Sequence, residues 1–314
     1  MKIHFIRHAT FAFEVGALRV LVAPMLGGAG TAPAVSNTPN QRPNHLVELP
    51  FGDDGLSDVI EGTDAVLVTH THNDHWDGRA WELIPKDRLV LCQPEDEAKI
   101  SGAGFTNVSA VDPGLAWKGL RFVRTRGRHG TGEIGKQMGP VSGFVVQAEG
   151  SPSLYIAGDT IWCDEVEEAL LAHRPDVIVV NAGAARFLEG DPITMTAEDV
   201  TQVCRASPEA RVIAVHMEAI NHCLFRRGPI WPKLSTNGDW PAESRSRPTA
   251  RPSKRRRERH AQETTLLSSR RTNVRLSPGC DVNGPRLGCR RRFFLRYAHG
   301  RRVVGGMPGG CGTR

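Results

Sequence analysis

Short apolar runs, separated by glycine, proline and polar residues, recur along the first 225 positions of the chain. Such runs, rich in Val, Ile, Leu and Phe, are typical of strands that are buried on at least one face. They predict strands over residues 2–6, 11–15, 18–22, 65–68, 88–91, 107–111, 120–125, 142–148, 153–156, 177–180 and 212–215. Longer stretches predict helices over residues 76–84, 94–101, 164–173 and 196–206. Strand pairs that alternate with helices favour a layered α/β domain.

The pattern changes at about Phe225, beyond which no apolar period persists. Residues 226–314 contain 22 Lys and Arg against 5 Asp and Glu, a net charge of +17, whereas residues 1–225 have a net charge of −11. We therefore expect a domain of residues 1–225 and an Arg-rich segment of residues 226–314 that buries too little surface to offset its ordering entropy. Two interpretations of this segment stay open: a disordered basic tail, or out-of-frame sequence that begins near Phe225.

Length and composition exclude several classes of protein. A chain of 314 residues and 34.3 kDa allows one large domain or two small ones. No apolar run approaches the ~20 residues that span a bilayer, and His4, Arg7 and His8 interrupt the N-terminal stretch that a signal peptide would need. The seven cysteines are scattered without a CxxC pair, so neither a disulfide framework nor a zinc ribbon is indicated. We expect a cytoplasmic protein without a membrane segment.

The segment from Thr69 to His75 reads THTHNDH and directly follows the apolar run AVLV. His70 and His72 are two positions apart, so their side chains point to the same side of an extended chain. Asp74 and His75 follow where the chain turns toward the next predicted helix, which places four candidate ligands at one strand end. Imidazole suits Zn²⁺, Fe or Mn, and a carboxylate suits a hard, water-bearing ion. A His-rich surface loop is the alternative, but this density of ligand types favours a metal site.

Three further candidate ligands occur at the ends of predicted strands. His129 lies in a glycine-rich loop, RGRHGTG, after the strand at residues 120–125. Asp159 follows an apolar strand in the phrase IAGDT, and His216 ends the run VIAVH. A lone His or Asp in such a place is more often a cap or a satisfied polar group. Here each repeats the order of apolar strand, ligand type and turn, which strengthens the prediction of a metal site.

This pattern resembles the metallo-β-lactamase superfamily, whose HxHxDH motif stands here as His70, His72, Asp74 and His75. The next three metal positions of that family match, in order, His129, Asp159 and His216. The local sequence is more similar still to the branch that includes L-ascorbate-6-phosphate lactonase and related Zn- or Mn-dependent hydrolases. The matching stretches are residues 7–11, 69–77, 129–143, 157–162 and 214–223. The resemblance covers about residues 2–225 and implies a four-layer αββα sandwich with the site on one edge.

The resemblance also implies roles that spacing alone does not give. One metal ion would be held by His70, His72 and His129, and the other by Asp74, His75 and His216. Asp159 would bridge both ions, and Asp74 and Asp159 would be the catalytic carboxylates. The resemblance implies two Zn²⁺ ions, with Mn²⁺ as the alternative. Two ions ~3.5–4 Å apart share a hydroxide, lower its pKa and stabilise the oxyanion that forms on attack at carbon or phosphorus.

The sequence departs from the family pattern in two places. The family usually has Asp at the position of Ala23, which lies in the segment LVAPM at the end of a predicted strand. Loss of a carboxylate that supports a ligand typically costs ~10–100-fold in metal affinity or activity. Relatives also continue past the segment of His216 with a helix and a short strand, and neither pattern follows Cys223 here.

Other residues near the motifs carry weaker signals. His8 follows the first predicted strand, and the sequence supports a structural role and a role in the metal site equally well. The same balance holds for Glu218 and His222, which lie just beyond His216. Trp76 adjoins a ligand loop, but an aromatic side chain in such a place is more often packed in the core than a platform for substrate.

These observations support three hypotheses about function. The first is a metal-dependent hydrolase that uses a metal-bridged hydroxide on a small-molecule lactone, another ester or a phosphodiester. The second is a nucleic-acid-binding protein that acts through residues 226–314, where Arg-rich sequence would bind polyanions without specificity. The third is an inactive remnant that keeps the metal motif but has an incomplete fold.

Overall fold

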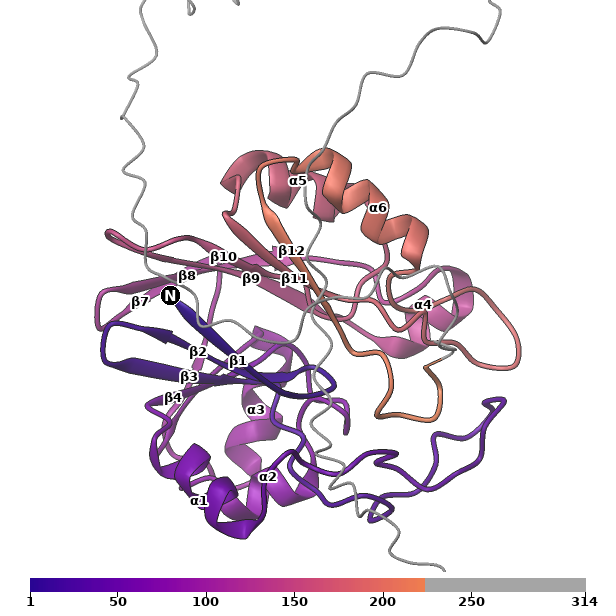
Figure 1. Ribbon diagram of the computed structural model, residues 1–314, viewed down its shortest axis with the longest axis horizontal. Helices are drawn as coiled ribbons and strands as arrows, with labels where there is room; N and C mark the ends of the chain where they lie inside the picture. Colours follow the sequence, from indigo (N-terminus) through magenta and orange to yellow (C-terminus); the bar gives the residue numbers. More distant parts are fainter. Residues whose placement is uncertain (224–314) are drawn as a thin grey trace, which may run out of the picture. The chain divides into compact units, whose positions relative to one another are not determined.

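The computed structural model describes residues 1–223. The predicted Arg-rich segment at 226–314, the nucleic-acid hypothesis that depends on it, and the predicted loss of a helix and strand after His216 lie outside these residues. Two six-stranded sheets form the centre of the described part, and helices cover the outer face of each (Figure 1). No helix among residues 1–223 has the length and apolar character needed to cross a membrane.

The first sheet has strands in sequence order, with antiparallel pairs at one edge and parallel pairs at the other. Its strands are β1 (Lys2–Arg7), β2 (Thr10–Val15), β3 (Leu18–Val22), β4 (Ala65–Val68), β5 (Leu89–Cys92) and β6 (Val108–Ala110). All four residues of β4 are buried, as expected of a parallel strand covered on both faces. The outer face of the sheet carries α1 (Asp53–Glu61), α2 (Gly78–Leu83) and α3 (Pro94–Gly102) (Figure 1).

The second sheet repeats this plan, again with antiparallel pairs followed by parallel pairs. Its strands are β7 (Gly114–Trp117), β8 (Leu120–Arg126), β9 (Ser142–Ala148), β10 (Leu154–Ile156), β11 (Val177–Asn181) and β12 (Arg211–Val215). Its outer face carries α5 (Asp164–His173) and α6 (Ala197–Ala206), and α4 (Gly132–Met138) follows β8 (Figure 1).

The main core lies between the two sheets. Phe11 and Phe13 of β2 pack in one buried cluster with Phe122 of β8 and Phe144 of β9. Separate apolar clusters lie between each sheet and its helices. The resulting order of helices, sheet, sheet and helices confirms the αββα sandwich that the resemblance implied.

The helices at residues 164–173 and 196–206 are confirmed, the second beginning after an N-cap at Thr196. Thr196 and Asp199 form a reciprocal capping box. The pattern missed α1, α4 and β7. Among these, α1 buries two residues, Leu56 and Ile60, as α6 does, but it contains a glycine and lacks the side-chain N-cap that Thr196 gives α6.

A long segment without regular secondary structure leads from β3 to α1, except for an isolated bridge between Ala32 and Asn44. The buried side chain of Asn221 holds it in place. Its Nδ2 donates to Thr38 Oγ1 at 2.7 Å and to the Val35 carbonyl at 3.1 Å, while its Oδ1 accepts from the Val35 amide and Asn44 Nδ2, each at 2.9 Å. The chain just after β12 thus anchors a loop of the first sheet.

Candidate metal centre

The loop between β4 and α2 brings four candidate ligands to one strand end. After β4 the chain turns, and the amides of His75 and Trp76 both donate to the His72 carbonyl at 2.9 Å. Asp77 then begins α2, because its carboxylate accepts from the Ala80 amide at 2.8 Å as an N-cap. The indole of Trp76 is fully buried and packs on Phe105, so it belongs to the core.

The first candidate ligand group consists of His70, His72 and His129, whose donor atoms lie within 4.8 Å of one another. His70 Nε2 lies 3.0 Å from His72 Nδ1. The Nδ1 of His129 contacts the Ile193 carbonyl at 2.8 Å. A carbonyl can only accept a hydrogen bond, so His129 Nδ1 carries the proton and Nε2 presents its lone pair.

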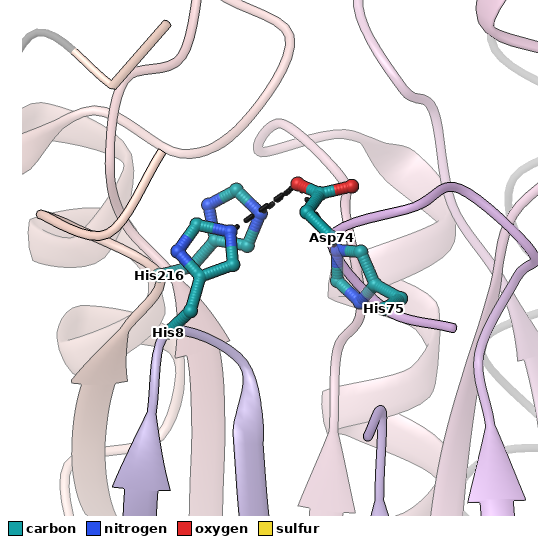
Figure 2. A group of neighbouring side chains, drawn as sticks. All are labelled: His8, Asp74, His75 and His216. Carbon is teal, nitrogen blue, oxygen red and sulfur yellow. Dashed lines mark hydrogen bonds and ion pairs between the residues drawn. The ribbon is translucent and has the colours of Figure 1, made fainter. Parts of the chain in front are cut away.

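The second candidate group consists of His8, Asp74, His75 and His216, again with donor atoms within 4.8 Å of one another (Figure 2). Three of these residues are those that the resemblance assigned to the second ion, and His8 is the fourth. His216 Nε2 lies 3.2 Å from Asp74 Oδ2. The group joins the two sheets, since Asp74 and His75 follow β4 and His216 follows β12.

Asp159 lies between the two groups. Its Oδ2 is 3.2 Å from His75 Nε2 and 3.5 Å from His129 Nε2, and its Oδ1 is 3.4 Å from His216 Nε2. Asn181, the last residue of β11, donates from Nδ2 to Asp159 Oδ1 at 2.5 Å. Sequence reasoning missed Asn181, because an amide at a strand end has no spacing that distinguishes it from a turn residue.

The protonation states fit a site for cations. Burial lowers the pKa values of His70 and His129 below the usual value for histidine, which favours neutral imidazoles. Burial alone would raise the pKa of Asp159, but the charges of His216 and His75 outweigh it and the pKa falls well below its usual value. The opposite holds for His216, where the charge of Asp159 overcomes burial and raises the pKa. Divalent ions need anionic carboxylates and neutral imidazoles, so an ion at this site would displace the proton that the raised pKa favours on His216.

One buried nitrogen supports this fit independently. His75 Nε2 is shielded from solvent and has no hydrogen-bond partner among residues 1–223, although it lies 3.2 Å from Asp159 Oδ2. A buried polar atom without a partner is costly unless something else satisfies it. A metal ion that accepts the lone pair of this nitrogen would do so.

The structure also places three residues that lie near the candidate ligands in the sequence or in space. Ala23 is buried at the end of β3 with a φ of 44°, and its carbonyl accepts from Thr10 Oγ1 at 2.7 Å. His222 is buried with its ring centroid 6.2 Å from that of His216, and burial lowers its pKa to about 4. Cys223 Sγ lies 3.7 Å from His216 Nδ1, and burial raises the pKa of this thiol.

Comparisons with known proteins agree with this architecture. The β-lactamase superfamily domain matches the chain over residues 19–217. UPF0173 protein YddR of Bacillus subtilis is 38% identical over 230 residues, which cover 72% of this chain and 89% of YddR. A UPF0173 metal-dependent hydrolase of Azorhizobium caulinodans is 26% identical over 200 residues, which cover 60% of this chain and 76% of that protein.

Solved structures extend this similarity. A possible metal-dependent hydrolase from Veillonella parvula is 34% identical with a TM-score of 0.67, and the match covers 70% of this chain and 87% of that one. The isothiocyanate hydrolase from Delia radicum gut bacteria is 33% identical with a TM-score of 0.68, covering 72% of this chain and 89% of that one. The chain therefore belongs to the metallo-β-lactamase superfamily and, within it, to a family of metal-dependent hydrolases.

Proposed function

We propose that this protein is a binuclear metal-dependent hydrolase. One observation carries the proposal: Asp159 lies within 3.5 Å of ring nitrogens from both ligand groups. Its carboxylate is thereby suited to bridge an ion held by His70, His72 and His129 and a second ion in the group of His75. Such ions, when bound, lower the pKa of water and polarise the bond under attack.

The protein's own residues would bind the ions and handle the proton. Asp159 is fixed by the amide of Asn181, so its carboxylate is preorganised to bridge. Asp74 is the more exposed carboxylate, with 13% of its side chain accessible against 2% for Asp159. The short contacts to His8 and His216 are made by its Oδ2. The other oxygen, Oδ1, would take the proton from the attacking water and return it to the leaving group.

The proposed substrates are a small lactone, another ester or a phosphodiester, because each presents a carbon or phosphorus atom that water can attack. Exposure points to the side from which substrate enters: His72 and Asp74 are partly exposed and Asn73 is exposed, whereas His70 and His75 are buried. Water and substrate would therefore reach the ligands across the turn of residues 72–74.

A second candidate substrate is an isothiocyanate, which the 33% identical isothiocyanate hydrolase favours. The central carbon of an isothiocyanate is an electrophile like an ester carbonyl. Addition of water across its C=N bond gives a thiocarbamic acid, so the same site would serve. This candidate needs no ligand beyond those of the main proposal.

Metal content and a substrate panel on the full-length protein test both proposals. The protein is stripped with a chelator, reloaded with Zn²⁺ or Mn²⁺ and measured for bound metal. It is then assayed on a lactone, a carboxylic ester, a phosphodiester and benzyl isothiocyanate. We expect two ions per chain and turnover that requires metal. A folded protein that retains no ion after reloading would contradict the proposal, and the panel decides between the substrate classes.

A further inference from the structure

His8 occupies an unusual position in the backbone. Arg7 of β1 pairs with Thr10 of β2, so His8 and Ala9 form a two-residue connection between the strands. The φ of His8 is 56°, in the left-handed region where such turns favour glycine. A residue with a side chain held there typically costs about 1–3 kcal/mol, and such residues gather at functional sites. The turn itself therefore does not explain why a histidine stands here.

The ring of His8 points into the second ligand group (Figure 2). It is buried, and its centroid lies 3.6 Å from that of His216 with the two planes 37° apart. The His8 carbonyl accepts a hydrogen bond from the His216 amide at 2.9 Å. The end of β1 in the first sheet is thus joined to the end of β12 in the second, and the His8 ring packs against the ring of His216.

The spacing of the donor atoms fits one shared cation. Asp74 Oδ2 lies 3.2 Å from His8 Nε2, 3.2 Å from His216 Nε2 and 3.8 Å from His75 Nε2. Neighbouring ligand atoms about 2.0–2.1 Å from one Zn²⁺ ion are about 2.9–3.4 Å apart, the shorter separations belonging to ions with five or six ligands. We propose that His8 is a metal ligand, a fifth protein donor to the ion held by Asp74, His75, His216 and the bridging Asp159. This inference rests on the proposed function and changes the ligand count of one ion.

The competing explanation is that His8 only positions Asp74 by donating a hydrogen bond from Nε2. Its Nδ1 is buried and has no hydrogen-bond partner among residues 1–223, so the protein around it does not fix the tautomer. The variant His8→Gln separates the two roles. Glutamine carries an amide N–H near the position of Nε2 and can still donate to Asp74, but an amide nitrogen does not bind a divalent ion as imidazole does.

The test uses the full-length protein loaded with Co²⁺, whose visible spectrum reports its ligands. The matched control is His4→Gln on β1, the strand that precedes His8, where His4 Nε2 pairs with Glu14 Oε2 at 3.4 Å outside both ligand groups. We expect His8→Gln to change the spectrum of one of the two bound ions and to lower the affinity for that ion by about 100-fold or more. This loss exceeds the one that typically follows removal of a hydrogen bond to a ligand. His4→Gln keeps the native spectrum and affinity.

A His8→Gln protein with the native spectrum and affinity would overturn the inference, whatever its turnover. Should His8→Gln fail to fold by circular dichroism, His8→Gly decides, because glycine relieves the backbone conformation at φ 56°. Adding imidazole to His8→Gly would restore the native spectrum if His8 is a ligand, and a lack of restoration counts against it. If the native protein binds no Co²⁺, the proposed function itself is overturned. If the His8→Gln protein binds two ions with the native spectrum and affinity, only the role of His8 is overturned.

Discussion

Replacing Asn181 with leucine tests how firmly the bridging carboxylate is held. Asn181 is buried at the end of β11, and its side chain donates a 2.5 Å hydrogen bond to Asp159. A hydrogen bond to a charged group contributes about 1.5–3 kcal/mol, and leucine keeps the side-chain volume while removing the donor. We expect Asn181→Leu to lower the free energy of unfolding of the metal-free protein by about that amount. Metal affinity should fall by about 10–100-fold, because Asp159 loses the partner that orients it.

Urea unfolding in a chelator measures the first effect, and titration with Co²⁺ measures the second. The matched control is Asn107→Leu, since Asn107 Nδ2 donates to the Asp87 carbonyl at 3.2 Å in an exposed position away from both ligand groups. This variant should stay within about 0.5 kcal/mol of the native protein, as surface changes usually do. The reasoning is refuted if Asn181→Leu matches Asn107→Leu in both unfolding free energy and metal affinity.

Three further predictions concern the ligands, the strand end beside them and a buried thiol. Elemental analysis should show that the double variant His70→Ala and His72→Ala loses bound metal, while His173→Ala at the end of α5 retains it. Equal metal content in the two variants would contradict the ligand assignment. The Ala23→Asp variant should retain more metal through dialysis and melt at a higher temperature with Zn²⁺, because Asp tolerates the φ of 44° better than most residues and supplies a carboxylate. A lower melting temperature with and without Zn²⁺, together with no gain in bound metal, would assign Ala23 to the core. Burial raises the pKa of Cys92 to about 12, so a thiol reagent at pH 8 should label it only after unfolding, and rapid labelling of the native protein would contradict its burial.

The fold and the ligand cluster were predictable because both depend on strongly patterned segments. The buried run AVLV gives β4, and three histidines and an aspartate follow it at once, so pattern and chemistry coincide at one strand end. The sequence alone could not show that His129 and His216, far apart along the chain, meet Asp159, since that depends on how the second sheet pairs. It could not decide between a structural and a site role for His8 either, because the direction of its ring follows from a left-handed turn conformation that no pattern in the sequence indicates.

The ligands come from both sheets, and this has a consequence for how the protein gains its stability. The loop after β4 supplies His70, His72, Asp74 and His75, whereas His129, Asp159 and His216 follow strands of the other sheet. If the proposed ions bind, neither half of the sandwich holds a complete set of donors, and the metal acts as a cross-link between the halves. Stability would then rise with the logarithm of free metal concentration, and chelation would loosen the two sheets at the edge that carries the ligands before it disturbs the apolar core between them. Cellular metal supply would thereby set how long the folded protein survives, independently of any substrate.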